Sequence, residues 1–259
     1  MADEQGASGG DRGELATNGS DAWVALVIGN SRYHWAQFVG DSLVQTWDEP
    51  HQLDRLDGGD FGAFRGLEGL PPLWVASVVP EQNQLWATYP NVRFLTLQDV
   101  PLAGLYPTLG IDRALALWGA IAQYGEPVLV IDAGTALTFT GADGEPRLVG
   151  GAILPGLRLQ FQALQRGTAA LPSVELPDPL PPRWATDTES AIASGILYTA
   201  IAGIQAYIHA WLEQFPNSPI VLTGGDGEYL ARHLASSSTP RIQWEPNLIF
   251  RGIQGVRHL

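Results

Sequence analysis

The chain has 259 residues, of which 45% are hydrophobic and 16% charged, so it is long enough for two domains of roughly 100–150 residues. It carries 27 acidic against 14 basic residues, a formal net charge of −13, with no cluster of Lys and Arg. A nucleic-acid partner is therefore not expected, because phosphate backbones are bound by a basic face. The absence of cysteine excludes disulfides and thiolate metal sites.

The first 21 residues are rich in Gly, Asp and Glu and are predicted to form a flexible acidic tail. They lack the apolar central segment of a signal peptide. No continuous apolar run elsewhere reaches the roughly 18–20 residues that a membrane helix needs. We therefore expect a soluble cytoplasmic protein that does not associate with a membrane.

In the first half, residues 23–28 are continuously apolar and predict a strand that is buried on both faces. This strand stops at Gly29 and Asn30, and residues 32–39 are expected to form a second strand paired with it through that tight turn. The remaining elements predicted here are short strands at 73–79 and 91–97 and a buried helix at 115–124.

The same pattern begins again in the second half. Residues 128–131 predict a buried strand that runs into Asp132-Ala133-Gly134-Thr135, and residues 137–140 predict its partner. The remaining elements predicted here are a strand at 148–153, an irregular proline-rich segment at 171–182, a long helix at 188–215, a strand at 220–222 and a helix at 227–234.

Residues 23–39 and 128–140 therefore look like two copies of one phosphate-binding hairpin. The repeat is short and by itself only suggests a duplicated α/β fold with two domains. We place the first at residues 22–126 and the second at 127–259, after the tail at 1–21.

The strongest local motif follows the strand at 128–131. Gly134 allows a tight turn that exposes backbone N–H groups, and Thr135 and Thr138 add hydroxyl donors. Such a turn can hold a phosphate while Asp132 binds a cation or a water beside it. An ordinary hairpin in which Asp132 caps the turn explains the same residues equally well.

The first half offers Ile28-Gly29-Asn30-Ser31-Arg32 in the equivalent place. Asn30 tolerates a positive φ, and the Ser31 hydroxyl can donate to a phosphate oxygen. Taken alone, this segment is more typical of a plain β-turn.

A third motif includes Gly110, Asp112 and Arg113, which precede an apolar helical run. Asp112 can be a simple N-cap with Arg113 as a solvated first-turn residue. Alternatively, Asp112 points into a cleft as a general base and Arg113 donates to a substrate carboxylate. Two glycine motifs, at 150–156 and 223–225, bring backbone close to a ligand or are packing turns.

The order of the motifs is more specific than any one of them. Along the chain the order is Gly-Asn-Ser, Gly-x-Asp-Arg, Asp-x-Gly-Thr-Ala-x-Thr, Gly-Gly-x-Ile-x-Pro-Gly, Thr-x-x-Ala-x-x-Ser-Gly and Thr-Gly-Gly. Over about residues 23–255 this order resembles the type III pantothenate kinases. The resemblance implies two ribonuclease H-like domains in tandem, of the actin/hexokinase superfamily, with ATP in the cleft between them. It also implies a homodimeric enzyme that phosphorylates pantothenate from ATP.

The resemblance further assigns roles to single residues. Asp112 matches the proton acceptor for the pantothenate hydroxyl. Asp132 matches a ligand of an activating monovalent cation, K⁺ or NH₄⁺, and Mg²⁺ is expected to arrive with ATP. The implied pantothenate contacts are Tyr106, Gly110, Ile111, Asp112, Arg113 and, from the partner subunit, Thr188. The implied ATP contacts are Val27, Ile28, Gly29, Asn30, Ser31, Arg32, Tyr33, His34 and Thr135.

The predicted helix at 188–215 also bears on the dimer. Its apolar side chains form a band wider than one core contact needs, which predicts that part of it faces another subunit. A helix that is fully buried inside its own domain is the alternative. The residues of this band are Ile192, Ile196, Leu197, Ala200, Ile201, Ile204, Ile208 and Trp211.

The chain departs from the family pattern at one important place. The first loop of the family usually reads Asp-x-Gly-Asn-Thr, whereas this chain has Val27-Ile28-Gly29-Asn30-Ser31. Val27 removes a carboxylate from the surroundings of the metal-bound phosphates. An active pantothenate kinase is the leading hypothesis, and a catalytically weak or silent relative that acts as a regulatory or binding protein is the alternative. A third hypothesis, a kinase of the same superfamily with another small alcohol substrate, is disfavoured by the Gly-Ile-Asp-Arg motif at 110–113.

Overall fold

The computed structural model describes residues 21–51, 69–234 and 242–259, so the predicted tail lies almost entirely outside the described residues. The elements of the first half are β1 (Ala22–Ile28), β2 (Arg32–Val39), β3 (Ser42–Pro50), β4 (Leu73–Ser77), α1 (Pro80–Trp86), β5 (Val92–Phe94), the short 3₁₀ helix η2 (Leu97–Asp99) and α2 (Ile111–Tyr124). Those of the second half are β6 (Val128–Ala133), β7 (Ala136–Ala142), β8 (Leu148–Pro155), α3 (Leu157–Gly167), α4 (Thr188–Gln214), β9 (Ile220–Thr223), α5 (Gly227–Leu234), β10 (Ile242–Trp244) and α6 (Leu248–Arg257).

The two halves repeat one sheet topology. The first sheet has the strand order β3-β2-β1-β4-β5, and the second, read from its other edge, has the order β8-β7-β6-β9-β10. In each sheet the first three strands are antiparallel neighbours, and the last two are parallel to the central strand. This is the ribonuclease H-like arrangement, so the duplication predicted from the two hairpins is confirmed.

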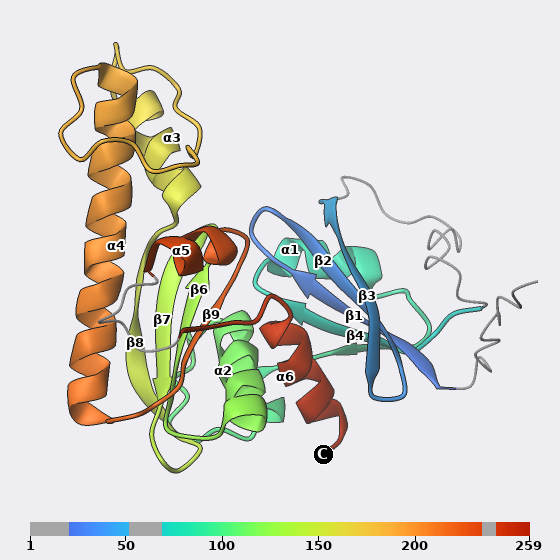
Figure 1. Cartoon of the computed structure of the whole chain (residues 1–259). Coiled ribbons are helices and arrows are strands. Elements are labelled where there is room, and N and C mark those ends of the chain that lie inside the picture. The colour runs from blue at the N-terminus through green and yellow to red at the C-terminus, as the bar shows by residue number, and fades with distance from the viewer. Residues whose placement is uncertain (1–20, 52–68, 235–241) are drawn as a thin grey trace, which may run out of the picture.

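Helices separate and cover the two sheets (Figure 1). α2 and α6 lie between the sheets, and their side chains share one core with Ala25 and Phe38 of the first sheet and Val130 of the second. α1 covers the other face of the first sheet. α3, α4 and α5 cover the outer face of the second. The residues of the central strands β1 and β6 therefore alternate between two cores, which explains their continuously apolar runs.

α2 and α6 approach each other closely because each presents a glycine at the crossing. A Cβ on Gly119 would overlap the carbonyl oxygen of Leu248, and one on Gly252 would overlap the carbonyl oxygen of Leu115. The same α6 reaches the first sheet, where Gln254 Nε2 donates to the carbonyl oxygen of Asp41 at 2.8 Å. α6, which belongs to the second half, thus packs against the first half as well.

The long helix α4 corrects the prediction that its apolar band faces another subunit. All eight residues of the band are buried within the chain, at 9% exposure or less, against the second sheet. The band is wide because it covers β6 and β7 together with α3 and α5. By length and apolar composition alone α4 would also suffice to cross a membrane, but this packing accounts for its apolar side chains.

The other local predictions differ from the structure mainly at element ends. The strands expected at 23–28 and 32–39 are β1 and β2, and the helix expected at 115–124 begins earlier, at Ile111. β3 was not predicted from the sequence. Pro80 begins α1 instead of only ending the strand before it, because proline suits the first turn of a helix.

Candidate active site

The β1–β2 and β6–β7 hairpins begin the two halves and frame the site. In the first turn, the Gly29 N–H donates to the carbonyl of Arg32 at 3.1 Å. In the second, the Gly134 N–H donates to the carbonyl of Ala136, also at 3.1 Å. Each turn therefore closes with a short backbone bond, and the remaining N–H groups and hydroxyls of the turn are left for other partners.

The strand register shows which residues correspond between the halves. Val27 is the second-to-last residue of β1 and pairs with Ala76 of β4. Asp132 is the second-to-last residue of β6 and pairs with Thr223 of β9. Val27 and Asp132 therefore occupy the same position, and both alternate away from the outer cores, toward the central layer.

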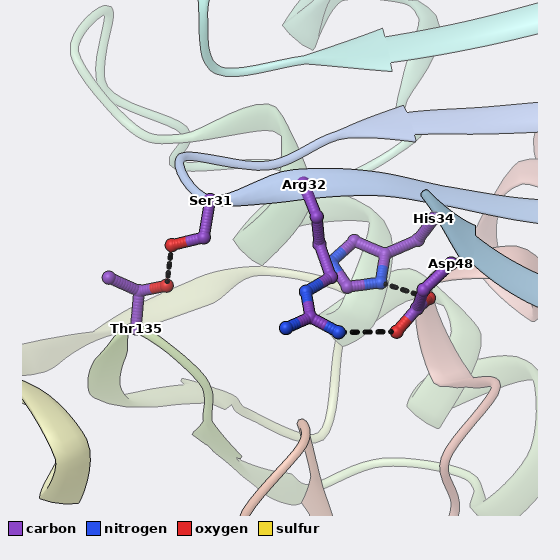
Figure 2. A network of polar contacts seen from close by, with 5 residues as sticks. All are labelled: Ser31, Arg32, His34, Asp48 and Thr135. Carbon is purple, nitrogen blue, oxygen red and sulfur yellow. Dashed lines mark hydrogen bonds and ion pairs between the residues drawn. The ribbon is translucent and has the colours of Figure 1, made fainter. Parts of the chain in front are cut away.

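The two turns meet across the space between the halves. The hydroxyls of Ser31 and Thr135, 104 residues apart in the chain, lie 2.9 Å from each other (Figure 2). Both residues are exposed, so the two hydroxyls are accessible to a ligand as well as to one another. The structure thus brings together the two segments that the sequence indicated as phosphate loops.

Two glycines allow other segments to approach the second turn. A Cβ on Gly156 would overlap the carbonyl oxygens of Gly134 and Thr135, and the Gly156 N–H donates to the latter at 2.9 Å. Gly224 has a φ of +87°, and a Cβ there would overlap Asp132 Oδ1. Gly156 and Gly224 therefore let their segments pack closely against the second turn, as the packing interpretation of the two glycine motifs predicted, whereas contact with a ligand stays a prediction.

Asp112 lies in the first turn of α2 and is not its N-cap. The N-cap is Gly110, which has no side-chain capping bond. Asp112 Oδ1 instead accepts the N–H of Arg113 at 2.8 Å. Burial raises the pKa of Asp112, and the backbone N–H and charge of Arg113 lower it in part. A half-buried carboxylate at a helix N-terminus is a suitable general base, because the same burial that raises its pKa strengthens its basicity.

Asp132 is close enough to Asp112 for the two carboxylates to repel each other. Burial, and after it the charge of Asp112, raise the pKa of Asp132 to about 7, against a smaller lowering by Arg113. Two such carboxylates are better ionised beside a cation. Within the described parts of the chain, no group of three or more His, Cys, Asp or Glu side chains converges on a metal site. A cation here would need oxygens from the backbone, water or a substrate as well.

Arg113 is buried, and its guanidinium is anchored by the protein itself. Nε donates to Thr140 Oγ1 at 3.0 Å, and Nη2 donates to the carbonyl oxygen of Phe139 at 2.9 Å. Nη1 donates to the hydroxyl of Tyr106 at 3.1 Å. The structure therefore brings Tyr106, Asp112 and Arg113 together, as expected for one substrate pocket, and it corrects the alternative in which Arg113 was a solvated first-turn residue.

Thr188 lies apart from this group within one chain. It is the first residue of α4, after the N-cap Asp187, and it is exposed. The N-terminal end of α4 projects beyond the second sheet, away from α2 (Figure 1). The structure of the single chain therefore does not group Thr188 with Tyr106, Asp112 and Arg113.

Comparison with known sequences identifies the family. A model of the family described as type III pantothenate kinase matches residues 23–210. The chain belongs to this family. A relative of that description from a Nostoc species is 49% identical, with 90% of this chain and 94% of the relative aligned. Another, from a Synechocystis species, is 46% identical over 91% of this chain and 90% of the relative.

Comparison with solved structures supports the fold of this type III pantothenate kinase family member. A Campylobacter jejuni protein described as a Baf family transcriptional activator superposes with a TM-score of 0.59 at 20% identity, covering 91% of this chain and 97% of that one. The ethanolamine utilization protein EutJ of Carboxydothermus hydrogenoformans superposes with a TM-score of 0.53 at 11% identity, covering 91% and 88%. At these identities the similarity shows the fold alone.

Two acidic residues near the turns of this family member were not predicted from the sequence. Asp226 is buried, its N–H donates to the carbonyl oxygen of Ala133, and its Oδ1 accepts Arg158 Nε at 3.0 Å. Asp48 of β3 contacts Arg32 and His34 beside the first turn. The strand-favouring residues Leu43, Val44, Thr46 and Trp47 were the available sequence signal for β3, and recognising that strand would have indicated Asp48.

Proposed function

We propose that this chain is a pantothenate kinase, which transfers the γ-phosphoryl group of ATP to the hydroxyl of pantothenate in the first step of coenzyme A synthesis. The observation that carries the proposal is the meeting of the two phosphate-type turns, through Ser31 and Thr135, in a chain of the type III family. A nucleotide held by both turns would place its phosphates between the halves, near the carboxylates of Asp112 and Asp132.

Phosphoryl transfer passes through a loose transition state, so positioning and charge neutralisation contribute most of the catalysis. Asp112 accepts the proton of the attacking hydroxyl as the oxygen–phosphorus bond forms, and ADP leaves with the electrons of the broken bond. Its raised pKa, caused first by burial, improves its match to this role near neutral pH. The proposed ATP contacts are the turn residues at 27–34 together with Thr135.

Asp132 fits a monovalent cation, K⁺ or NH₄⁺, better than it fits free solvation. It lies one residue before the end of a buried strand, beside Gly134 and Gly224. Burial and the charge of Asp112 raise its pKa to about 7, and among the described residues Arg113 is the opposite charge that lowers it in part. Such a cation would supply a positive charge that stabilises the ionised form. Mg²⁺ is proposed to arrive with ATP, bound chiefly by its phosphates.

The catalytically silent alternative rested on Val27. The relatives with which the chain shares 45–49% identity over most of its length are described as type III pantothenate kinases, which supports an active enzyme. We therefore infer that Val27 changes how the first turn handles charge and leaves the activity in place. A cytoplasmic location is proposed with this metabolic role.

A homodimer with shared active sites is proposed on the position of Thr188. The support is that Thr188 is exposed on the N-terminal end of α4, apart from Asp112 in the same chain. The apolar band of α4 supplies no support, because it is buried within the chain. Substrate contact by Thr188 would thus pair the α4 end of one chain with the α2 end of another.

The deciding experiment is a coupled assay of ADP release with pantothenate, ATP, Mg²⁺ and K⁺. Release that depends on pantothenate, with formation of phosphopantothenate shown by mass spectrometry, is the expected result. A reaction without pantothenate controls for simple ATP hydrolysis, and pantothenol controls for recognition of the carboxylate. ADP release that is the same with and without pantothenate would contradict the proposal.

A further inference from the structure

The first half carries a polar cluster beside its turn, formed by Arg32, His34 and Asp48, whose arrangement the reaction above leaves unexplained. Asp48 Oδ1 lies 2.7 Å from His34 Nδ1, and Asp48 Oδ2 accepts Arg32 Nη1 at 3.3 Å (Figure 2). One carboxylate therefore bridges two potential cations that come from the neighbouring strand. We call this group the Asp48 cluster.

The strand register places the Asp48 cluster on the face that is turned to the second half. His34 pairs with Val27 on one side and with Asp48 on the other, so the three form one row across β1, β2 and β3. Arg32 lies two residues from His34 and shares its face. The same face of β2 carries Phe38 in the central core. Figure 2 shows Arg32 and Ser31 extending to the same side of the hairpin, where Ser31 meets Thr135.

The two turns differ in the charged side chains beside them. The second turn carries Asp132 at the position where the first carries Val27. On the face of β1–β3 that is turned to the second half, the Asp48 cluster supplies ionisable groups beside the first turn, and His51, which packs on Tyr33 of the outer core, places Nε2 2.8 Å from the carbonyl oxygen of Gly29. A guanidinium is the side chain best suited to bind phosphate oxygens through two parallel N–H groups. Arg32 is thus placed to neutralise phosphate charge directly, at the turn that lacks a carboxylate to hold a cation.

We infer that Asp48 is a positioning residue for ATP, which acts by holding Arg32, and with it His34, over the first turn. The inference rests on the proposed function, because it takes the turns to bind the nucleotide. An Arg side chain that is free in solution must lose its rotamer freedom when it binds a phosphate, whereas one already held by Asp48 loses less. Asp48 would thereby tighten ATP binding without touching the nucleotide.

A plain surface ion pair is the competing explanation, and its consequences differ. The side chains of Arg32, His34 and Asp48 are 55%, 42% and 48% exposed, and ion pairs this exposed contribute little to stability. Removing Asp48 should therefore leave the melting temperature unchanged under either explanation. If Asp48 does nothing beyond adding negative charge near the phosphates, its removal should tighten nucleotide binding. The positioning role predicts the opposite sign.

The test measures binding of Mg·AMP-PNP by calorimetry, so that it does not depend on pantothenate turnover. For Asp48→Ala we expect the Kd to rise about three- to tenfold, which is the range expected for ordering one long side chain. In turnover, KM for ATP should rise by the same factor with kcat unchanged, and Asp48→Glu should restore most of the loss. The matched control is Asp41→Ala. Asp41 follows the opposite end of β2 and its Oδ1 lies 2.9 Å from His258 Nε2, so this variant breaks another exposed His–Asp pair.

A double-mutant cycle decides whether Asp48 acts through Arg32. Arg32→Gln alone should weaken Mg·AMP-PNP binding, and Arg32→Gln with Asp48→Ala should bind no more weakly than Arg32→Gln alone. Additive losses, an unchanged Kd, or tighter binding by Asp48→Ala would overturn the inference. A wild-type protein that binds Mg·AMP-PNP but does not phosphorylate pantothenate would overturn the proposed function alone. Absence of nucleotide binding would overturn both.

Discussion

Val27 and Asp132 occupy the same position in the two halves, one residue before the end of the central strand of each sheet. An internal duplication has thus kept the backbone of both hairpins while only the second retains a carboxylate there. The buried isopropyl group of Val27 packs into the central core, and Asp132 faces Asp112 instead. At this position the second half therefore contributes a carboxylate to the site and the first half contributes none.

Asp112→Asn should lose most phosphorylation of pantothenate while nucleotide binding survives. Removal of a general base costs on the order of 10²–10⁴ in rate. The measurement is kcat from the coupled assay, alongside the Kd for Mg·AMP-PNP. Glu81→Gln is the matched control, because Glu81 is also an acidic residue in the first turn of a helix, α1. Turnover near that of the wild type in Asp112→Asn would leave this carboxylate with only a local structural role.

Asp132 should make stability depend on pH in the absence of K⁺. Its pKa is about 7 in the folded protein and about 3.8 when unfolded, so between these values the folded state binds a proton that the unfolded state has released. The free energy of unfolding should therefore fall as the pH rises through this window, and the loss should be complete above pH 7. Asp132→Asn removes this penalty.

We accordingly expect Asp132→Asn to be more stable than the wild type at pH 8 by roughly 1–3 kcal/mol, and by less at pH 5. Urea unfolding in a tetramethylammonium buffer measures this difference. Replacing tetramethylammonium by K⁺ at equal ionic strength should stabilise the wild type and raise its turnover. The same replacement should change neither the stability nor the turnover of Asp132→Asn. Equal stability and equal rates in the two cations would contradict a cation site at Asp132.

Gly224→Ala should be strongly destabilising, whereas Gly225→Ala should not. Gly224 has a φ of +87° and its Cβ would overlap Asp132 and the backbone of Ala133. A Cβ on the adjacent Gly225 would meet nothing within 4 Å. We expect a loss of about 1–3 kcal/mol for Gly224→Ala and a change within about 0.5 kcal/mol for Gly225→Ala, measured by urea unfolding. Similar values for the two variants would show that the backbone around Asp132 tolerates displacement.

The sequence predicted the two hairpins and their repetition, because apolar runs that end in glycine turns depend on local chemistry. Local chemistry left the roles of Asp112 and Asp132 open, and only the family resemblance placed them in one site, where their roles stay predictions. It did not predict Asp48, which reaches the site only through the pairing of β3 with β2. The prediction that part of the apolar band of α4 faces another subunit was also wrong, because the band is buried within the chain. The width of an apolar face shows how much surface is buried, but periodicity cannot tell a sheet of the same chain from a second subunit.

Mixing two inactive variants should restore activity if the sites are shared between subunits. Asp112→Asn and Thr188→Ala are both expected to be nearly inactive alone. In a heterodimer, one site would carry both defects and the other neither, so activity should recover toward half of the wild-type value in each heterodimer. Thr186→Ala in place of Thr188→Ala is the control for mixing itself, because Thr186 is likewise exposed just before α4.

Subunit exchange must be demonstrated separately, by native mass spectrometry of one labelled and one unlabelled variant. Exchange without recovery of activity would show that each chain builds its own site. A protein that remains monomeric at assay concentration, with full activity, would contradict the shared site directly.

The crossing of α2 and α6 links the order of synthesis to the order of folding. The face of α2 at Leu115 and Gly119 is filled by α6, which is made after every other described element. While the chain is still emerging from the ribosome, the first half therefore displays an uncovered apolar helix face, even though its own five strands are complete. Chaperones would meet this surface on the nascent chain. Premature termination before Leu248 should accordingly yield an aggregating fragment rather than an independently folded first domain.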